Sequence, residues 1–137
     1  MAEGIEALRR VPLFGGMSDR ELRKVLEITK EVTHPEGQTV VEEDRSAVGF
    51  HLIIDGTAEA FVGGQSVGTI GPGDYFGEMS LLDGKPRSAT VKATSELRTL
   101  VVPSWSFNLL LDKHPEIMRA LLVELCERLR RVEALRG

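Results

Sequence analysis

The chain has 137 residues, of which 42% are hydrophobic and 28% charged, a balance typical of one globular domain that excludes a disordered chain. The formal net charge of -4 gives no basic excess for contacts along nucleic-acid phosphates, and no apolar run is long enough to span a membrane. The single cysteine excludes an internal disulfide and fits a reducing cytoplasm. We therefore expect one cytoplasmic domain over residues 1–137, with no membrane segment and no direct nucleic-acid binding.

Residues 1–30 predict a helical lead-in. Residues 5–9 favour a short helix that ends before a proline. Ser18 and Glu21 have the spacing of a capping box, in which each side chain bonds to the backbone N–H of the other residue. Apolar residues then recur at helical spacing, so a second helix is expected over residues 19–29.

Residues 31–103 have the pattern of a β domain. Short β-rich runs are separated by turns rich in glycine, proline and aspartate, such as Asp55-Gly56 and Gly63-Gly64. The runs are residues 39–42, 50–54, 57–62, 66–70, 88–93 and 97–102. Many short strands joined by regular turns predict an α+β, mainly β fold in the form of a sandwich or jelly roll.

The helical period returns in residues 104–137. Ser104 is expected to cap a first helix, and Pro115 suits the first turn of a second one. The break between the two helices, at His114, is therefore a predicted hinge.

The last helix carries an apolar seam. Its members follow one another at alternating steps of four and three residues, the spacing of a coiled coil, and they are Met118, Leu122, Leu125, Leu129 and Val132. Ile117 and Leu121 widen the stripe and are expected to face the core. The seam is expected to face a second subunit, which would make a homodimer, or to close as a lid over a ligand. Packing of the whole stripe into the core is the alternative.

Residues 76–89 combine groups that suit a nucleotide. The backbone N–H groups of residues 77–80 can bind an anion if they form the first turn of a helix, where they have no internal partner. Arg87 adds a planar guanidinium that can hold a phosphate through two parallel hydrogen bonds. The Glu78 carboxylate only accepts hydrogen bonds, so it suits a ribose hydroxyl. A phosphate site beside a fixed acceptor indicates a nucleotide and not free phosphate.

The same segment resembles the phosphate-binding cassette of the cyclic nucleotide-binding domain family. It reads Phe76-Gly77-Glu78-Met79-Ser80-Leu81, followed by Pro86-Arg87-Ser88-Ala89. The pattern is specific because two halves must occur at the right separation. The resemblance covers nearly the whole chain. It departs from the family at the turn Glu43-Asp44-Arg45, which is usually Glu-Gly-x, and at Val48, which replaces a common acidic residue.

The resemblance implies a β jelly-roll barrel (double-stranded β-helix) flanked by N-terminal helices and two C-terminal helices. It implies a cyclic nucleotide sensor whose C-terminal helices move on binding. In the family, a serine at the position of Ser88 looks typical of domains that prefer cyclic AMP, whereas a threonine there often accompanies a preference for cyclic GMP. The ligand-binding residues that it implies are Phe76, Gly77, Glu78, Met79, Ser80, Arg87, Ser88 and Ala89.

The surroundings of the cassette can also be predicted. Because the cassette interrupts the roll between strands, its loop is expected where two sheet edges meet. Candidates for the apolar wall of the pocket are Phe61, Ile70, Leu81, Leu82 and Val91.

A catalytic function is not expected. His34, His51 and His114 are scattered along the chain, and no metal-ligand spacing emerges among them. No nucleophile arrangement is present, and Cys126 is expected to be a buried structural thiol. We therefore predict a protein that is not an enzyme and has no metal cofactor.

Other functional classes stay open. An interaction module that binds no nucleotide would keep the same fold. The chain also fits a free-standing sensor or the sensor part of a longer transcription regulator, channel or enzyme.

Overall fold

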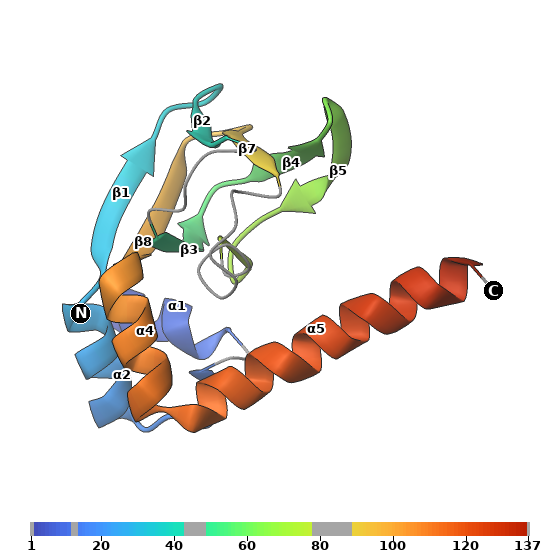
Figure 1. The fold of residues 1–137 in the computed structure, drawn as a ribbon. Helices are drawn as coiled ribbons and strands as arrows, with labels where there is room; N and C mark the ends of the chain where they lie inside the picture. Colours follow the sequence, from blue (N-terminus) through green and yellow to red (C-terminus); the bar gives the residue numbers. More distant parts are fainter. Residues whose placement is uncertain (1, 12–13, 43–48, 78–88, 137) are drawn as a thin grey trace.

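The computed structural model describes residues 2–11, 14–42, 49–77 and 89–136 (Figure 1). Two helices lead into a β roll, and two helices follow it. The helices are α1 (Ala2–Arg9), α2 (Asp19–Glu27), α4 (Ser104–Lys113) and α5 (Pro115–Arg136). The strands are β1 (Lys30–His34), β2 (Thr39–Val41), β3 (Gly49–Asp55), β4 (Ala58–Val62), β5 (Gln65–Ile70), β6 (Tyr75–Phe76), β7 (Thr90–Ala93) and β8 (Leu97–Pro103).

Within the described residues, the strands form two antiparallel four-stranded sheets. One has the order β1-β8-β3-β6, and we call it the helix-facing sheet because the helices pack on it. The other has the order β2-β7-β4-β5, and we call it the distal sheet. This is the mainly β jelly roll with flanking helices that the sequence predicts, and it confirms the fold class.

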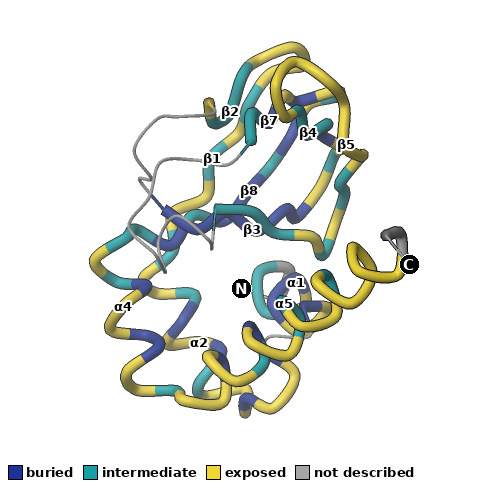
Figure 2. The backbone as a smooth tube through the Cα atoms, turned by 45° about the vertical axis from the view of Figure 1, so that its right-hand side comes forward, coloured by how far each residue is buried: buried dark blue, intermediate teal, exposed yellow. Residues whose placement is uncertain are grey.

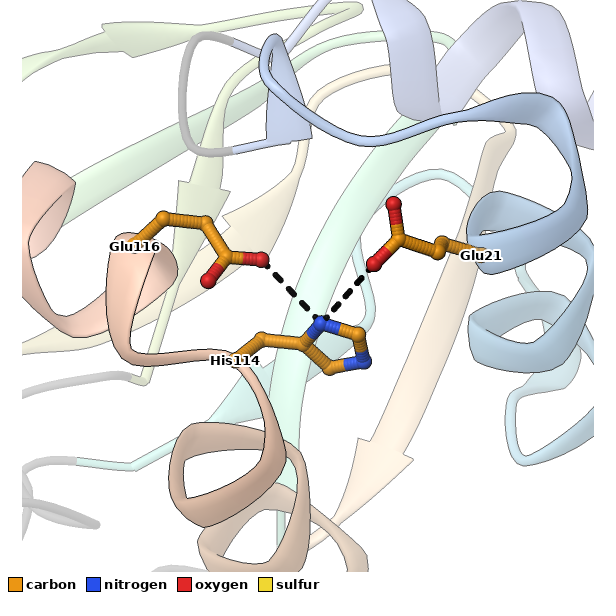
Figure 3. Close-up of side chains that lie close together, drawn as sticks. All are labelled: Glu21, His114 and Glu116. Atoms are coloured by element: carbon orange, nitrogen blue, oxygen red, sulfur yellow. Dashed lines mark hydrogen bonds and ion pairs between the residues drawn. The ribbon is translucent and has the colours of Figure 1, made fainter.

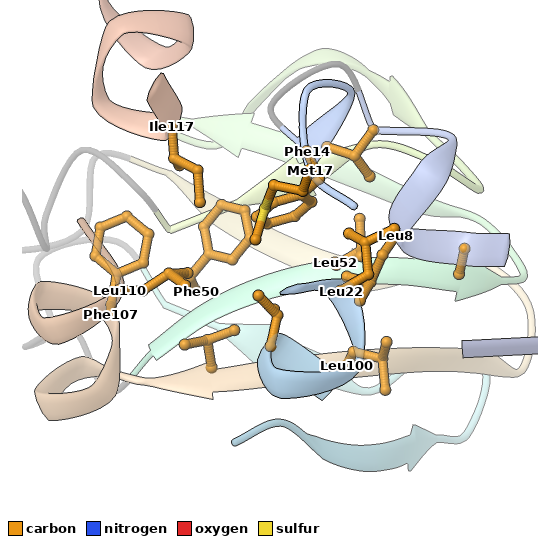
Figure 4. Close-up of a cluster of buried hydrophobic side chains, with 14 of the residues drawn as sticks. Leu8, Phe14, Met17, Leu22, Phe50, Leu52, Leu100, Phe107, Leu110 and Ile117 are labelled. Carbon is orange, nitrogen blue, oxygen red and sulfur yellow. The ribbon is translucent and has the colours of Figure 1, made fainter. Parts of the chain in front are cut away.

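The helix-facing sheet has one side against the helices and the other against the distal sheet. Along β3, Phe50 and Leu52 join a helix-side core that includes Phe107 of α4 and Ile117 of α5 (Figure 4). Ile53, which points the other way because side chains alternate along a strand, joins an inter-sheet core. The apolar run in β3 is nearly continuous because both of its faces are buried.

The lead-in helix α2 begins as predicted. The Ser18 hydroxyl accepts a hydrogen bond from the Glu21 backbone N–H at 3.2 Å, and the Ser18 backbone N–H donates to the Glu21 carboxylate at 3.0 Å. The hydrogen bond from the Ser18 backbone N–H is the main cause that lowers the pKa of Glu21, because it stabilises the charged carboxylate. The helix ends at Glu27, two residues before the predicted end.

The strands β1 and β6 were not predicted. β1 has the sequence KEVTH, in which Val32 is the only large apolar side chain. Most of its residues are exposed. It is a strand because it pairs with β8, with Lys30 opposite Val101 and His34 opposite Leu97. β6 has only two residues and depends on pairing with β3. Neither strand carries enough local signal to be recognised without its partner.

The two C-terminal helices are separated by the predicted break, whose role as a hinge stays a prediction, and the predicted cap needs correction. α5 begins at Pro115, and His114 between the helices has the non-helical angles φ -130° and ψ 78°. Pro103 is the N-cap residue of α4, with no side-chain cap bond, so the prediction that Ser104 caps this helix is wrong. Ser104 already lies inside the first turn, where its side chain is past the capping position.

The helix α5 is tied to the core only near its start. Ile117 and Leu121 are 1% and 2% exposed, as predicted, but Leu122 and Leu129 are each more than half exposed. Figure 2 shows the rest of the helix drawn largely as exposed, and Figure 1 shows it running away from the helical layer. The alternative in which the whole stripe packs into the core is therefore wrong. Contact of the seam with a second subunit or with the ligand stays a prediction.

The exposure of the cysteine side chain also differs from the prediction. Cys126 is exposed on α5, so the prediction of a buried structural thiol is wrong. Its helix has already left the core at that point.

Among the described residues, no helix is long and apolar enough to cross a lipid bilayer.

The turn between β3 and β4 requires a glycine. Gly56 has a φ of +89°, and a Cβ atom built on it would overlap the backbone oxygen of Glu96. The Asp55 carboxylate accepts a hydrogen bond from the Gly56 N–H at 3.0 Å, which fixes the turn further. Gly64, in the next hairpin, has a similar φ of +82° but no neighbouring atom within 4 Å of its Cβ position.

We predict that Gly56→Ala destabilises the fold much more than Gly64→Ala. Both substitutions put a side chain in a left-handed conformation, at a cost of about 1–2 kcal/mol. Only Gly56→Ala also forces two backbone segments apart, so its total should reach about 3 kcal/mol or more. Urea unfolding of the two variants measures the difference. Equal losses would show that the close approach to Glu96 does not constrain the turn.

Candidate functional site

The segment predicted to bind the nucleotide starts from a strand held on both faces. In β6, Tyr75 packs toward the helix-side core, with its ring centroid 5.2 Å from that of Phe50. The next residue, Phe76, packs against the inter-sheet core and stacks on His51 at 4.8 Å with the rings nearly parallel. Two consecutive aromatic residues thus fix the start of the cassette between the two cores.

A tight turn delivers the chain to β6. Residues Gly71-Pro72-Gly73-Asp74 form this turn, in which the Asp74 N–H donates to the Gly71 carbonyl at 2.9 Å and Gly73 has a φ of +91°. Proline followed by a glycine at positive φ is the signature of a type II turn. The Ile53 N–H donates to the Asp74 carbonyl at 2.9 Å, and the Gly73 N–H donates to the Ile53 carbonyl at 3.0 Å. These bonds fix the turn to β3.

Both ends of the cassette are described. Gly77 is half-buried and has a φ of +97°, a left-handed conformation that glycine adopts without strain. Ala89 is half-buried and directly precedes β7. β6 is an edge strand, but β7 lies between β2 and β4. The cassette therefore joins the edge of one sheet to an inner strand of the other, and the prediction of two sheet edges holds only at its start.

The remaining ligand-binding residues implied by the resemblance are Glu78, Met79, Ser80, Arg87 and Ser88, and these lie outside the described residues. So do two candidates for the pocket wall, Leu81 and Leu82, and the turn at residues 43–45 with Val48. The roles assigned to these side chains stay predictions.

An apolar surface between the sheets adjoins the cassette. The inter-sheet core consists of the buried side chains Ile53, Ala58, Val91, Ala93 and Leu97. Half-buried apolar side chains pack against it, and these are Val40, Val41, Ala60, Ile70 and Phe76. Ile70 and Val91, which the sequence suggested as wall residues, both belong to this surface.

Phe61 does not belong to it. On β4, Ala58 and Ala60 face the inter-sheet core, so Phe61 points to the outer face because side chains alternate along a strand. The ammonium group of the exposed Lys92 lies 5.8 Å from the centre of the Phe61 ring, which is a cation–π contact. The prediction that Phe61 forms part of the pocket wall is therefore wrong.

Two residues that position the cassette were missed in the sequence. His51 stacks on Phe76, and Tyr75 packs on Phe50, although neither was named as a functional residue. A weak signal was present, because two adjacent aromatic residues before a glycine must point to opposite faces of a strand. The cross-strand partner His51 could not be identified without the register of β3 and β6.

Known proteins are similar to this chain in sequence and in architecture. A family model for the cyclic nucleotide-binding domain matches residues 31–114. The cAMP-dependent protein kinase regulatory subunit of Emericella nidulans is 35% identical over 114 residues, which are 82% of this chain and 28% of the relative. This chain thus spans little more than a quarter of the length of that relative.

Solved structures agree with this match. The catabolite activator protein of Thermus thermophilus has a TM-score of 0.83 and 29% identity, covering 90% of this chain and 60% of that one. The structure of cAMP-bound PfPKA-R has a TM-score of 0.80 and 29% identity, covering 94% of this chain and 46% of that one. The matched family segment contains the cassette, nearly the whole roll and α4. The chain belongs to the cyclic nucleotide-binding domain family.

Proposed function

We propose that this chain is a sensor that binds cyclic AMP, with cyclic GMP as the weaker ligand, and that it repositions its C-terminal helices on binding. The observation that carries the proposal is the setting of residues 76–89. Their described ends, Phe76-Gly77 and Ala89, adjoin a half-buried apolar surface between the sheets. The sequence between these ends carries Glu78 and Arg87, which suit a ribose hydroxyl and a phosphate.

Each part of the ligand has a proposed partner. Arg87 and the backbone N–H groups of residues 77–80 hold the cyclic phosphate, and the Ser88 hydroxyl adds a hydrogen bond. Glu78 accepts the hydrogen of the ribose 2′-hydroxyl. The apolar side chains near Ile70 and Val91 cover non-polar parts of the ligand, as binding sites commonly do. No bond is broken, so the output must be a change in the population of conformations.

Packing offers a route for such a change. Tyr75, next to the cassette, contacts Phe50, and Phe50 stacks on Phe107 of α4 with ring centroids 5.4 Å apart. α4 ends at the non-helical residue His114, and α5 beyond Leu121 is mostly exposed. A shift at the start of the cassette would therefore displace side chains that contact α4, the helix next to the hinge. The position of α5 past the hinge is held by few buried side chains, so a modest difference in ligand affinity suffices to move it.

The proposal predicts that Arg87→Ala weakens cyclic AMP binding by roughly 2 to 5 kcal/mol, because the bound phosphate loses its charged partner in a desolvated site. Arg87→Lys should recover only part of the loss, since an ammonium cannot make the paired contact. Arg98→Ala is the matched control, because Arg98 pairs with Glu31 on the sheet surface at 3.2 Å. Titration calorimetry measures all three. Binding by folded Arg87→Ala within a factor of two of wild type would remove Arg87 from the site.

A second prediction concerns the ribose. Glu78→Gln keeps a neutral acceptor, so it should weaken cyclic AMP binding less than Arg87→Ala does. It should also reduce the preference for cyclic AMP over its 2′-deoxy analogue. Glu59→Gln on β4 serves as the control carboxylate. If competition binding shows an unchanged preference for the ribose form in Glu78→Gln, another group holds the hydroxyl.

A third prediction concerns the helices. Trp105 lies on α4 and is 70% exposed, so its fluorescence reports on changes before the hinge. Cyclic AMP should change this fluorescence and slow hydrogen exchange in residues 116–132, because the bound form favours one position of α5. Arg87→Ala should abolish both responses. Protection limited to the cassette at saturating ligand would contradict the movement of α5 while leaving the binding site intact.

A further inference from the structure

Three side chains from two distant parts of the chain meet at the break between α4 and α5. We call Glu21, His114 and Glu116 the hinge cluster, and Figure 3 shows both carboxylates pointing at the same imidazole nitrogen. The Nδ1 atom of His114 lies 3.1 Å from a Glu116 oxygen and 3.3 Å from a Glu21 oxygen. Glu21 comes from α2, and Glu116 lies in the first turn of α5.

One hydrogen atom on Nδ1 cannot make a full hydrogen bond to both carboxylates. Whether the imidazole is neutral or protonated, Nδ1 carries at most one hydrogen, and two carboxylate oxygens compete for it. In the neutral tautomer with the hydrogen on the other nitrogen, a lone pair faces both oxygens. A divalent cation would instead attract all three ligand atoms at once and balance the two negative charges.

The spacing of the ligand atoms fits a small cation. In a tetrahedral zinc site, with metal–ligand bonds of about 2.0–2.2 Å, neighbouring ligand atoms lie about 3.3–3.6 Å apart. The two distances to Nδ1, 3.1 and 3.3 Å, are close to this range. The three ligand atoms all lie within 4.8 Å of one another. Small rotations of the glutamate side chains would complete the geometry.

The capping box fixes one of these ligands. One oxygen of Glu21 accepts the Ser18 N–H at 3.0 Å, and the other oxygen faces His114. Such an outer hydrogen bond holds a ligand in place and keeps it charged. The His114 side chain is 16% exposed, whereas the Glu21 and Glu116 side chains are 40% and 47% exposed. The imidazole is therefore mostly buried, while the two carboxylates are accessible to an incoming ion and to water.

We propose that the hinge cluster binds one zinc ion through His114 Nδ1, Glu21 and Glu116, with water as the fourth ligand. Imidazole and carboxylate ligands together suit zinc better than magnesium or calcium, which take oxygen ligands. The nearby Lys24 and Lys113 reduce the negative potential, so a moderate affinity is expected. A bound ion would tie α2 to the first turn of α5 across the hinge.

Zinc titration of the nucleotide-free chain tests the site, with Cys126→Ser as the background because the exposed thiol is also a metal ligand. Competition with a chromophoric chelator should show one equivalent of bound zinc. Cobalt substituted for zinc should show the visible absorption of a tetrahedral site. Glu21→Gln and Glu116→Gln should each weaken binding about tenfold or more. Glu21→Gln is informative because glutamine also completes a capping box, so the helix start is preserved.

Two control variants complete the test. His34→Gln and Glu127→Gln change the same residue types outside the hinge cluster and should leave zinc affinity unchanged. No binding by the parent protein, or binding that Glu21→Gln and Glu116→Gln leave unchanged, overturns the proposal. Because no nucleotide is present in these measurements, their outcome is independent of the proposed function.

Discussion

Strand β3 is buried on both faces and supports both layers of the domain. Phe50 and Leu52 pack against the helices, while Ile53 packs against the distal sheet. Each face contributes apolar surface that the opposite layer needs, so neither layer forms a core alone. The same strand also holds the turn before β6 through hydrogen bonds of Ile53. The helical layer and the start of the cassette therefore share one rigid support.

This arrangement places the inter-sheet core and the helices on opposite sides of the same sheet. Phe76 and Tyr75 divide between the two cores, and Tyr75 continues through Phe50 to Phe107. Closely packed aromatic side chains transmit displacement because they cannot compress. The cyclic nucleotide sensor that we propose breaks no bond at its site. It needs only a ligand that is bound more tightly in one arrangement of the helices than in another.

The hinge combines weak packing with concentrated charge. Ile117 and Leu121 hold the start of α5 in the helix-side core, and the helix beyond them is mostly exposed. The polar contacts of the hinge are made by His114 with two carboxylates from different helices. Ion pairs at exposed positions contribute little to stability, so such a cluster can change its partners without unfolding the domain. Occupancy of this cluster by an ion would therefore affect the hinge more than the fold.

Features that depend on neighbours in the chain can be predicted from the sequence. The capping box of Ser18, the turn at Asp55-Gly56 and the helix start at Pro115 follow from local hydrogen bonding and backbone angles, and the cassette is recognisable as a contiguous motif. Contacts between residues far apart in the chain emerge only when the whole chain is packed. β1 and β6 exist because of their strand partners, Phe61 is turned outward by the alternation along β4, and Cys126 is exposed because α5 leaves the core. The meeting of Glu21 with His114 likewise depends on packing between helices far apart in sequence, which local patterns do not encode.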